Sequence, residues 1–189
     1  MMKRLLIGLS ACAAMLATPV VLELPVWARV QQFSQAIAQN LQSEENPIVM
    51  QLAVEQKVIE LDAQGETVSR WQSLEGDQIQ VQPGDTLRYW LDIQNLSDRP
   101  VSDLAIVQPV PDNTVYILET ATADDNTVIT FSIDGGNQFV AAPTISVTLA
   151  DGSVVTQPAP AEAYTHIRWQ FAQANPSTSL VANYQVEVR

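Results

Sequence analysis

The sequence from Gln82 to Leu118 reads QPGDTLRYWLDIQN, LSDRP, VSDLAIVQP, VPDN and TVYIL, alternating strand-like segments with turns. In residues 86–95 every second position is apolar or aromatic, which is typical of a strand with one buried face. Pro83 and Gly84 suit the centre of a type II turn, because proline fixes the first φ and glycine accepts a positive second φ. Two further strands are expected at residues 101–108 and 115–118. This stretch predicts antiparallel β-structure rather than an α/β enzyme core.

The same alternation extends through the rest of the chain. Residues 48–61 have apolar side chains at every second position, and a change of phase near Gln56 and Lys57 predicts a β-bulge. The segment around Trp71 and the proline-rich residues 157–163 are expected to be irregular. Further strands, each with apolar side chains inward, are expected at residues 78–81, 128–133, 144–149, 166–171 and 180–188. About eight or nine strands predict an all-β fold, an immunoglobulin-like antiparallel β-sandwich over residues 47–189.

The first 28 residues have the layout of a secretory signal peptide. Lys3 and Arg4 precede an apolar run, and Val26 and Ala28 place small residues before a cleavage site after Ala28. Two alternatives remain open, an uncleaved N-terminal anchor and a lipoprotein modified at Cys12. All three predict an extracytoplasmic location, in the periplasm, the outer envelope or the medium. Residues 29–46 are then expected to be a linker, either disordered or a short amphipathic helix.

Net charge limits the class of partner. The chain has 9 basic and 21 acidic residues, a formal net charge of −12 at pH 7. Such a field repels phosphate backbones and anionic membranes, so we expect no nucleic-acid partner, and after processing no stable membrane span. The charge favours solubility, and a monomer is expected.

Strand-end acids are the candidates for a metal site. Asp124, Asp125 and Asp134 lie in predicted loops, and calcium binds oxygen ligands gathered from loops. Their spacing is not that of a dedicated calcium loop, so no metal site is predicted and calcium is the only cofactor considered. Residues 132–139, SIDGGNQF, fit the Asp-box pattern, in which an aspartate side chain closes a hairpin turn. We interpret this single copy as a turn.

The sequence lacks the residue combinations of common catalytic sites. Its one histidine, His166, alternates with Ile167 and Trp169, which predicts that the histidine points away from the core. No cysteine follows Cys12, and no G-x-S-x-G turn is present. No catalytic residue and no enzyme activity are predicted. Trp90 is the candidate interaction residue, because it lies in mid-strand on the face opposite Leu91; it either anchors an interface or is covered by the segment carrying Trp71.

Several segments together resemble a known bacterial family. They are PGDTLRYWLDIQNLSDRPVSDLAIVQPVPDNTVYI at residues 83–117, SIDGG at 132–136, YTHIRWQF at 164–171 and VANYQVEV at 181–188. The pattern of Pro-Gly-Asp, a tyrosine-bearing strand ending in asparagine, a Pro-any-Pro loop and a late tryptophan strand is similar to the bacterial conserved repeat domain, domain of unknown function 11. The resemblance covers residues 48–189 and extends to small exported cyanobacterial members of the family. It implies an immunoglobulin-like sandwich in extracytoplasmic or cell-surface proteins, with no catalytic residues.

These observations predict a non-enzymatic exported module. Its expected role is structural, or lies in contact with an envelope or surface protein whose identity the sequence does not encode. The alternative is a calcium- or carbohydrate-binding module that uses loop acids and exposed aromatic side chains.

We predict that the exported protein begins at Arg29, because signal peptidase cleaves after small residues such as Ala28. The measurement is the intact mass and N-terminal sequence of the protein recovered outside the cytoplasm. Retention of residues 1–28, or a lipid on Cys12, would contradict the prediction in favour of one of the two alternatives.

Overall fold

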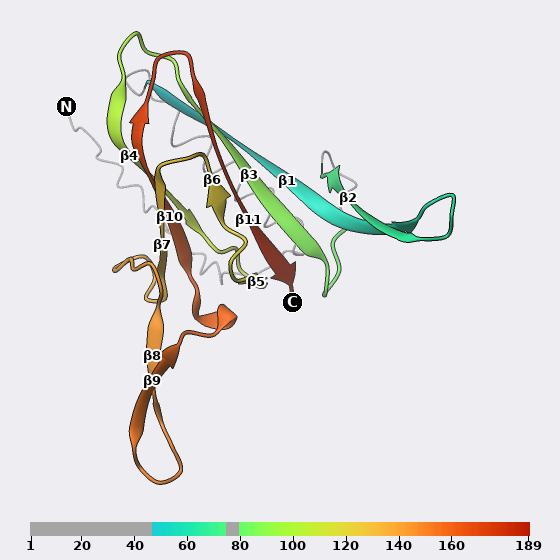
Figure 1. The fold of residues 1–189 in the computed structure, drawn as a ribbon, viewed down its shortest axis with the longest axis vertical. Helices are drawn as coiled ribbons and strands as arrows, with labels where there is room; N and C mark the ends of the chain where they lie inside the picture. The colour runs from blue at the N-terminus through green and yellow to red at the C-terminus, as the bar shows by residue number, and fades with distance from the viewer. Residues whose placement is uncertain (1–46, 75–79) are drawn as a thin grey trace, which may run out of the picture.

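The computed structural model describes residues 47–74 and 80–189, which form two packed antiparallel sheets and two projecting hairpins (Figure 1). The predicted signal peptide, its cleavage site at Ala28, the linker at residues 29–46 and residues 78–79 of one expected strand lie outside the described residues. The strands are β1 (Ile48–Leu61), β2 (Thr67–Ser73), β3 (Thr86–Asn95), β4 (Val101–Pro109), β5 (Thr114–Tyr116), β6 (Thr122–Ala123), β7 (Thr127–Ser132), β8 (Thr144–Thr148), β9 (Val154–Pro158), β10 (His166–Ala174) and β11 (Ser179–Val188), with one short 3-10 helix, η1 (Ala161–Ala163).

The strands confirm the predicted all-β sandwich. One sheet has the order β2-β1-β3-β11-β5, with β6 also paired to β11, and the facing sheet has the order β4-β10-β7. An immunoglobulin order places the last strand beside the one before it. Here β11 pairs with β3 and lies in the sheet opposite β10, so that strand order is not confirmed. In residues 47–74 and 80–189 no helix is long and apolar enough to cross a membrane.

The core lies between the two sheets and is formed by the alternate residues that the sequence predicts in β3, β10 and β11. Leu91, Trp169 and Tyr184 are each fully buried. The Tyr184 ring stacks on Tyr89 with centroids 5.1 Å apart, and its centroid lies 5.8 Å from that of Trp169. Fully burying one large apolar side chain contributes about 1.5–3 kcal/mol, so this aromatic group is a major source of stability. Burial also raises the pKa of Tyr89 and of Tyr184, which stay protonated at neutral pH.

The Pro-Gly-Asp motif forms the predicted type II turn before β3. Gly84 has a φ of +92°, and the Asp85 N–H donates to the Gln82 carbonyl at 3.0 Å. The Asp85 carboxylate accepts the Gln82 N–H at 2.7 Å and the Gln56 side-chain amide at 2.8 Å. This motif therefore both closes the turn and ties it to β1.

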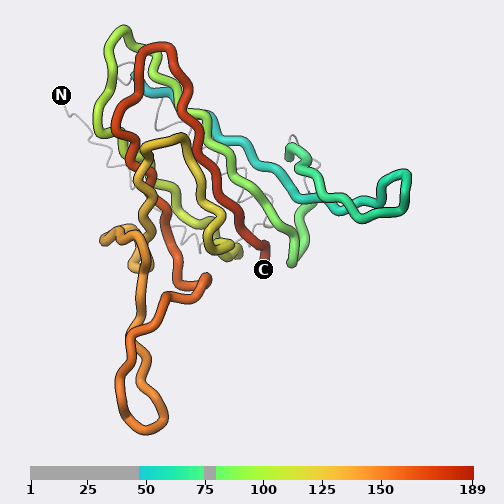
Figure 2. The backbone as a smooth tube through the Cα atoms, in the orientation of Figure 1, coloured from blue at the N-terminus to red at the C-terminus, as the bar shows by residue number. Residues whose placement is uncertain are grey.

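The β1–β2 hairpin corrects two predictions. The register of β1 against β3 is unbroken as far as Gln56, and that against β2 is unbroken from Glu55 to Leu61, so the predicted bulge is wrong. The segment around Trp71 is strand β2 rather than irregular. Beyond Glu55 the hairpin extends away from the sandwich (Figures 1 and 2), and we call residues 55–73 the first arm. The hydrophobic pattern changes phase here because the strand leaves the core, where one face no longer has to be apolar.

The β8–β9 hairpin corrects two further predictions. Residues 144–149 were expected to point apolar side chains into the core, but β8 pairs only with β9 and the hairpin projects from the sandwich (Figure 2). Strand β9 includes residues 157–158, the first two residues of the proline-rich segment 157–163 that was predicted to be irregular. A period of two describes an isolated hairpin as well as a core strand, so the pattern could not separate them. We call residues 144–158 the second arm.

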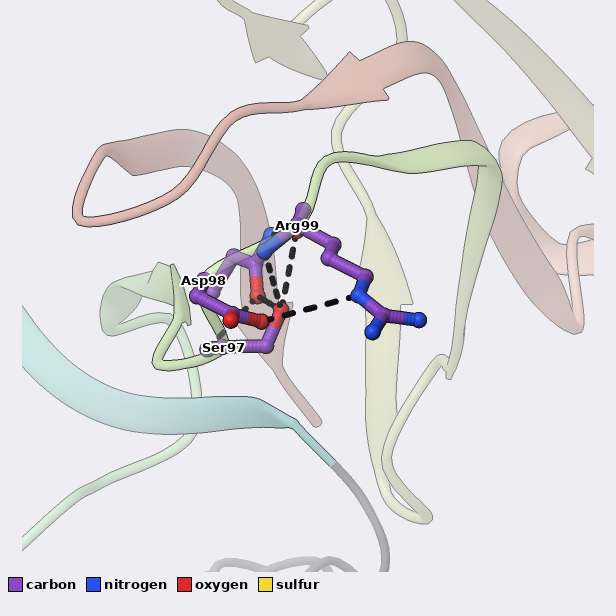
Figure 3. Close-up of polar contacts among 4 residues, drawn as sticks. Ser97, Asp98 and Arg99 are labelled. Atoms are coloured by element: carbon purple, nitrogen blue, oxygen red, sulfur yellow. Dashed lines mark hydrogen bonds and ion pairs between the residues drawn. The ribbon is translucent and has the colours of Figure 1, made fainter.

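Asn95 joins the two sheets at the end of β3. Its fully buried amide donates to the Ala174 carbonyl at 2.9 Å, in the facing sheet, and to the Arg99 carbonyl at 2.7 Å. Its Oδ1 accepts the Ser97 N–H at 3.0 Å and the Ser97 hydroxyl at 2.8 Å. Figure 3 shows the turn itself, where the Ser97 hydroxyl bonds the Arg99 backbone and Asp98 forms a 3.8 Å ion pair with the Arg99 side chain.

We expect Asn95→Leu to lower the free energy of unfolding by about 1–3 kcal/mol, because the Ala174 and Arg99 carbonyls and the Ser97 N–H each lose a hydrogen bond to the buried amide. Urea denaturation measures the change. Asp98→Asn is the matched control in the same turn, and it should leave the midpoint unchanged because the Asp98–Arg99 pair is exposed. Equal midpoints for Asn95→Leu and the wild type would contradict the role of Asn95.

Candidate interaction surface

Trp90 lies in the middle of β3 on the outer face of the six-stranded sheet. Its side chain is half-buried, and the small Ala53 on β1 is its cross-strand neighbour. The guanidinium carbon of Arg88 lies 5.4 Å from the centroid of the Trp90 ring and 4.3 Å from that of Trp71. Arg88 therefore packs on both tryptophans, and cation–π attraction of this kind contributes about 0.5–2 kcal/mol.

Glu55 fixes the position of Arg88. The two residues are cross-strand partners on β1 and β3, and Arg88 Nε donates to Glu55 Oε2 at 2.6 Å. A second guanidinium nitrogen pairs with the same carboxylate. The two side chains are 22% and 25% exposed, so water screens this pair less than a fully exposed one. We call Glu55, Trp71, Arg88 and Trp90 the tryptophan–arginine cluster.

Of the two alternatives left open for Trp90, the covering by the Trp71 segment is confirmed in part, and the role as an interface anchor stays a prediction. Trp71 does reach the site, from strand β2 rather than from a loop, and Arg88 covers the ring faces turned toward it. Each of these two tryptophans is still partly accessible to solvent. Arg88 and Glu55 were not predicted as part of this site, because their contact depends on the register of β1 against β3, which residue spacing within one strand does not give.

Exposed apolar side chains continue this face along the first arm. Ile59 is 67% exposed and Leu61 72% exposed. Both fall on the same side of β1 as Glu55 and Lys57, since side chains alternate along a strand. The cluster and the arm tip thus form one elongated surface that combines aromatic, aliphatic and cationic groups, and large exposed apolar patches mark contact sites.

Asp134 closes a turn instead of presenting its carboxylate to a ligand. Its Oδ1 accepts the Ser132 hydroxyl at 2.6 Å, the Asn137 N–H at 3.1 Å and the Gln138 N–H at 3.0 Å. Hydrogen bonds from that hydroxyl and from the backbone lower the pKa of Asp134. The Asp-box pattern therefore forms the structural turn that the sequence predicts. Phe139, its aromatic position, is covered by the Arg168 guanidinium, which lies 4.6 Å from the ring centroid.

The other two metal candidates do not join Asp134. Asp124 and Asp125 are exposed beside β6, and one Asp124 carboxylate oxygen accepts the Val181 N–H of β11 at 2.7 Å. In the described ranges no three histidine, cysteine, aspartate or glutamate side chains lie close enough together to hold a metal ion. His166 packs against Gly136 on the outer side of β10, as its alternation with Ile167 predicts.

Comparisons with protein-family models, with curated proteins and with solved structures found no match. The resemblance to the bacterial conserved repeat domain stays a prediction. The surface must be interpreted from its own chemistry.

We expect Arg88→Ala to increase quenching of tryptophan fluorescence by acrylamide and to destabilise the domain by about 1–2 kcal/mol, because both rings lose their cover and Glu55 loses its partner. The control is Arg70→Ala. Arg70 pairs with Glu60 on the opposite side of the first arm, where both side chains are well exposed, so quenching should stay at the wild-type level. Equal quenching in the two variants would contradict the packing of Arg88 on the tryptophans.

Proposed function

We propose that this chain is a non-enzymatic, exported β-sandwich module that acts by contact with another protein of the cell envelope or surface. The observation that carries the proposal is the elongated surface of the first arm, where Ile59 and Leu61 are exposed beside the tryptophan–arginine cluster. Exposing such side chains to water is unfavourable, and covering them in a complex removes that cost.

The chemistry of the surface favours a protein partner. Interface centres are enriched in tryptophan and arginine, and both residue types stand together here. Lys57 adds a cation beside Ile59 in a chain with a net charge of −12. A partner with an apolar patch and an acidic border would fit both features.

The other ligand classes have less support. A sugar would need an open tryptophan face, and Arg88 covers the faces that Trp71 and Trp90 turn toward it. Calcium would need oxygen ligands held together, and the best candidate, Asp134, already accepts three hydrogen bonds within its turn. The predicted signal peptide supports the extracytoplasmic part of the proposal.

We predict that a photoreactive phenylalanine analogue placed at Ile59 forms a covalent adduct with one other protein when intact cells are irradiated. Ile59 is at the exposed end of the surface, so the label reaches the partner without disturbing the core. Mass spectrometry of the adduct in the extracytoplasmic fraction identifies the partner.

The matched position is Asp112, an exposed turn residue between β4 and β5. The label there should not give the Ile59 adduct. In a Leu61→Ser background the Ile59 adduct should weaken at least several-fold, since the contact loses apolar area. No adduct from Ile59, or the same adducts from both positions, would overturn the proposed contact.

A further inference from the structure

The second arm has unusual composition for so acidic a chain. From Gly135 to Ala161 the sequence contains one charged residue, Asp151, at the hairpin turn. Figure 1 shows β8 and β9 projecting from the sandwich, and the two strands form a sheet of their own. A two-stranded hairpin is at best marginally stable in water, so a further strand would stabilise it.

Two hydrogen bonds establish which backbone groups face outward. The Leu149 N–H donates to the Ser153 carbonyl at 2.8 Å, and the Ala159 N–H donates to the Pro143 carbonyl at 2.9 Å. Hydrogen-bonded pairs recur at every second residue of an antiparallel ladder. The backbone N–H and C=O groups of the odd-numbered residues of β8 therefore point toward β9. Those of Thr144, Ser146 and Thr148 point to the outer edge of the hairpin. Across the described chain, β8 has no strand on that side.

This edge lacks the features that protect two other edges of the described chain, those of β4 and β9. Native proteins block free edges with charge, proline or irregular backbone. Strand β4 carries Asp103 at a positive φ of 53°. The outer edge of β9 ends in Pro158, which has no N–H to donate. Strand β8, TISVT, has no charge, no proline and no glycine. It is the open edge of the arm.

We propose that the β8 edge pairs antiparallel with β8 of a second copy of this chain, with Ser146 at the two-fold axis. Ser146 then faces Ser146 of the second copy, and Thr144 faces its Thr148. All three residues present both backbone groups to the partner, so each forms a hydrogen-bonded pair. The result is a continuous four-stranded sheet with the order β9-β8-β8-β9.

A second copy fits better than an arbitrary strand because the register is self-complementary. Odd residues meet odd residues, so the apolar faces of the two arms stay on one side of the sheet and the hydroxyl faces stay on the other. The mainly apolar face comprises Ile145, Val147, Leu149 and Val155 with Gln157, and the hydroxyl-bearing face comprises Thr144, Ser146, Thr148 and Thr156 with Val154 and Pro158. A two-fold contact requires this match of a surface with itself. The net charge of the whole chain predicts a monomer. The two paired β8 strands carry no charge, so they add no electrostatic repulsion to the dimer contact.

The first test is the mass of the full-length chain in solution, measured by size-exclusion chromatography with light scattering. We expect twice the chain mass for the wild type and the single-chain mass for Ser146→Pro. That proline removes an outward N–H and leaves the β8–β9 ladder intact. Thr156→Pro is the matched control, because it removes an outward N–H from β9 and should keep the dimer. Circular dichroism checks that both variants remain folded.

The second test is a disulfide in a Cys12→Ala background. Ser146→Cys should form a disulfide-linked dimer under mild oxidation, because paired residues in an antiparallel ladder have Cα atoms about 5.5 Å apart, within disulfide range. Thr156→Cys should not. Added salt should raise the dimer fraction by screening the acidic sandwiches.

A wild type with the mass of one chain, a dimer that survives Ser146→Pro, or equal crosslinking of both cysteines would each overturn the proposal. If β8 instead binds a strand of another protein, the purified chain has the single mass, which also overturns it. The proposal does not depend on the contact at Ile59, and its failure would leave that contact untouched.

Discussion

A buried amide at Asn95 is the polar constraint on which the sandwich depends. Apolar packing between sheets has no direction, so it leaves their relative position open. The Asn95 side chain adds direction, because its donors reach Ala174 in the facing sheet and Arg99 in the turn while its carbonyl holds Ser97. A buried amide is stable only when its partners are in place. The end of β3, the end of β10 and the turn into β4 are therefore fixed together.

Sequence alone predicted the central part of the fold, because there the periodicity and burial have the same cause. Leu91 and Trp169 alternate with polar residues because they lie between two sheets. In the two arms, periodicity and burial are not linked in this way. Val147 and Ile59 also alternate with polar residues, yet they lie on hairpins outside the core. A period of two indicates a strand with two different faces, but it does not indicate what covers either face.

The candidate interaction surface was only partly predictable for a related reason. Trp90 could be assigned to the outer face from its own strand. Its environment depends on Glu55 and Trp71, which belong to other strands, and register between strands is set by long-range packing. Asp134 shows the opposite case, because its cited partners all lie within four positions of it in the sequence and the local motif predicted the turn that they form.

The separation of the arms from the core affects which substitutions this chain can tolerate during evolution. No residue of either arm belongs to the buried cluster between the sheets. Substitutions at the arms therefore leave the main source of folding free energy intact, as stability effects at distant sites add independently. Under the proposed function, binding specificity can diverge on the arms while the scaffold remains constant, so paralogues can acquire different partners without refolding the sandwich.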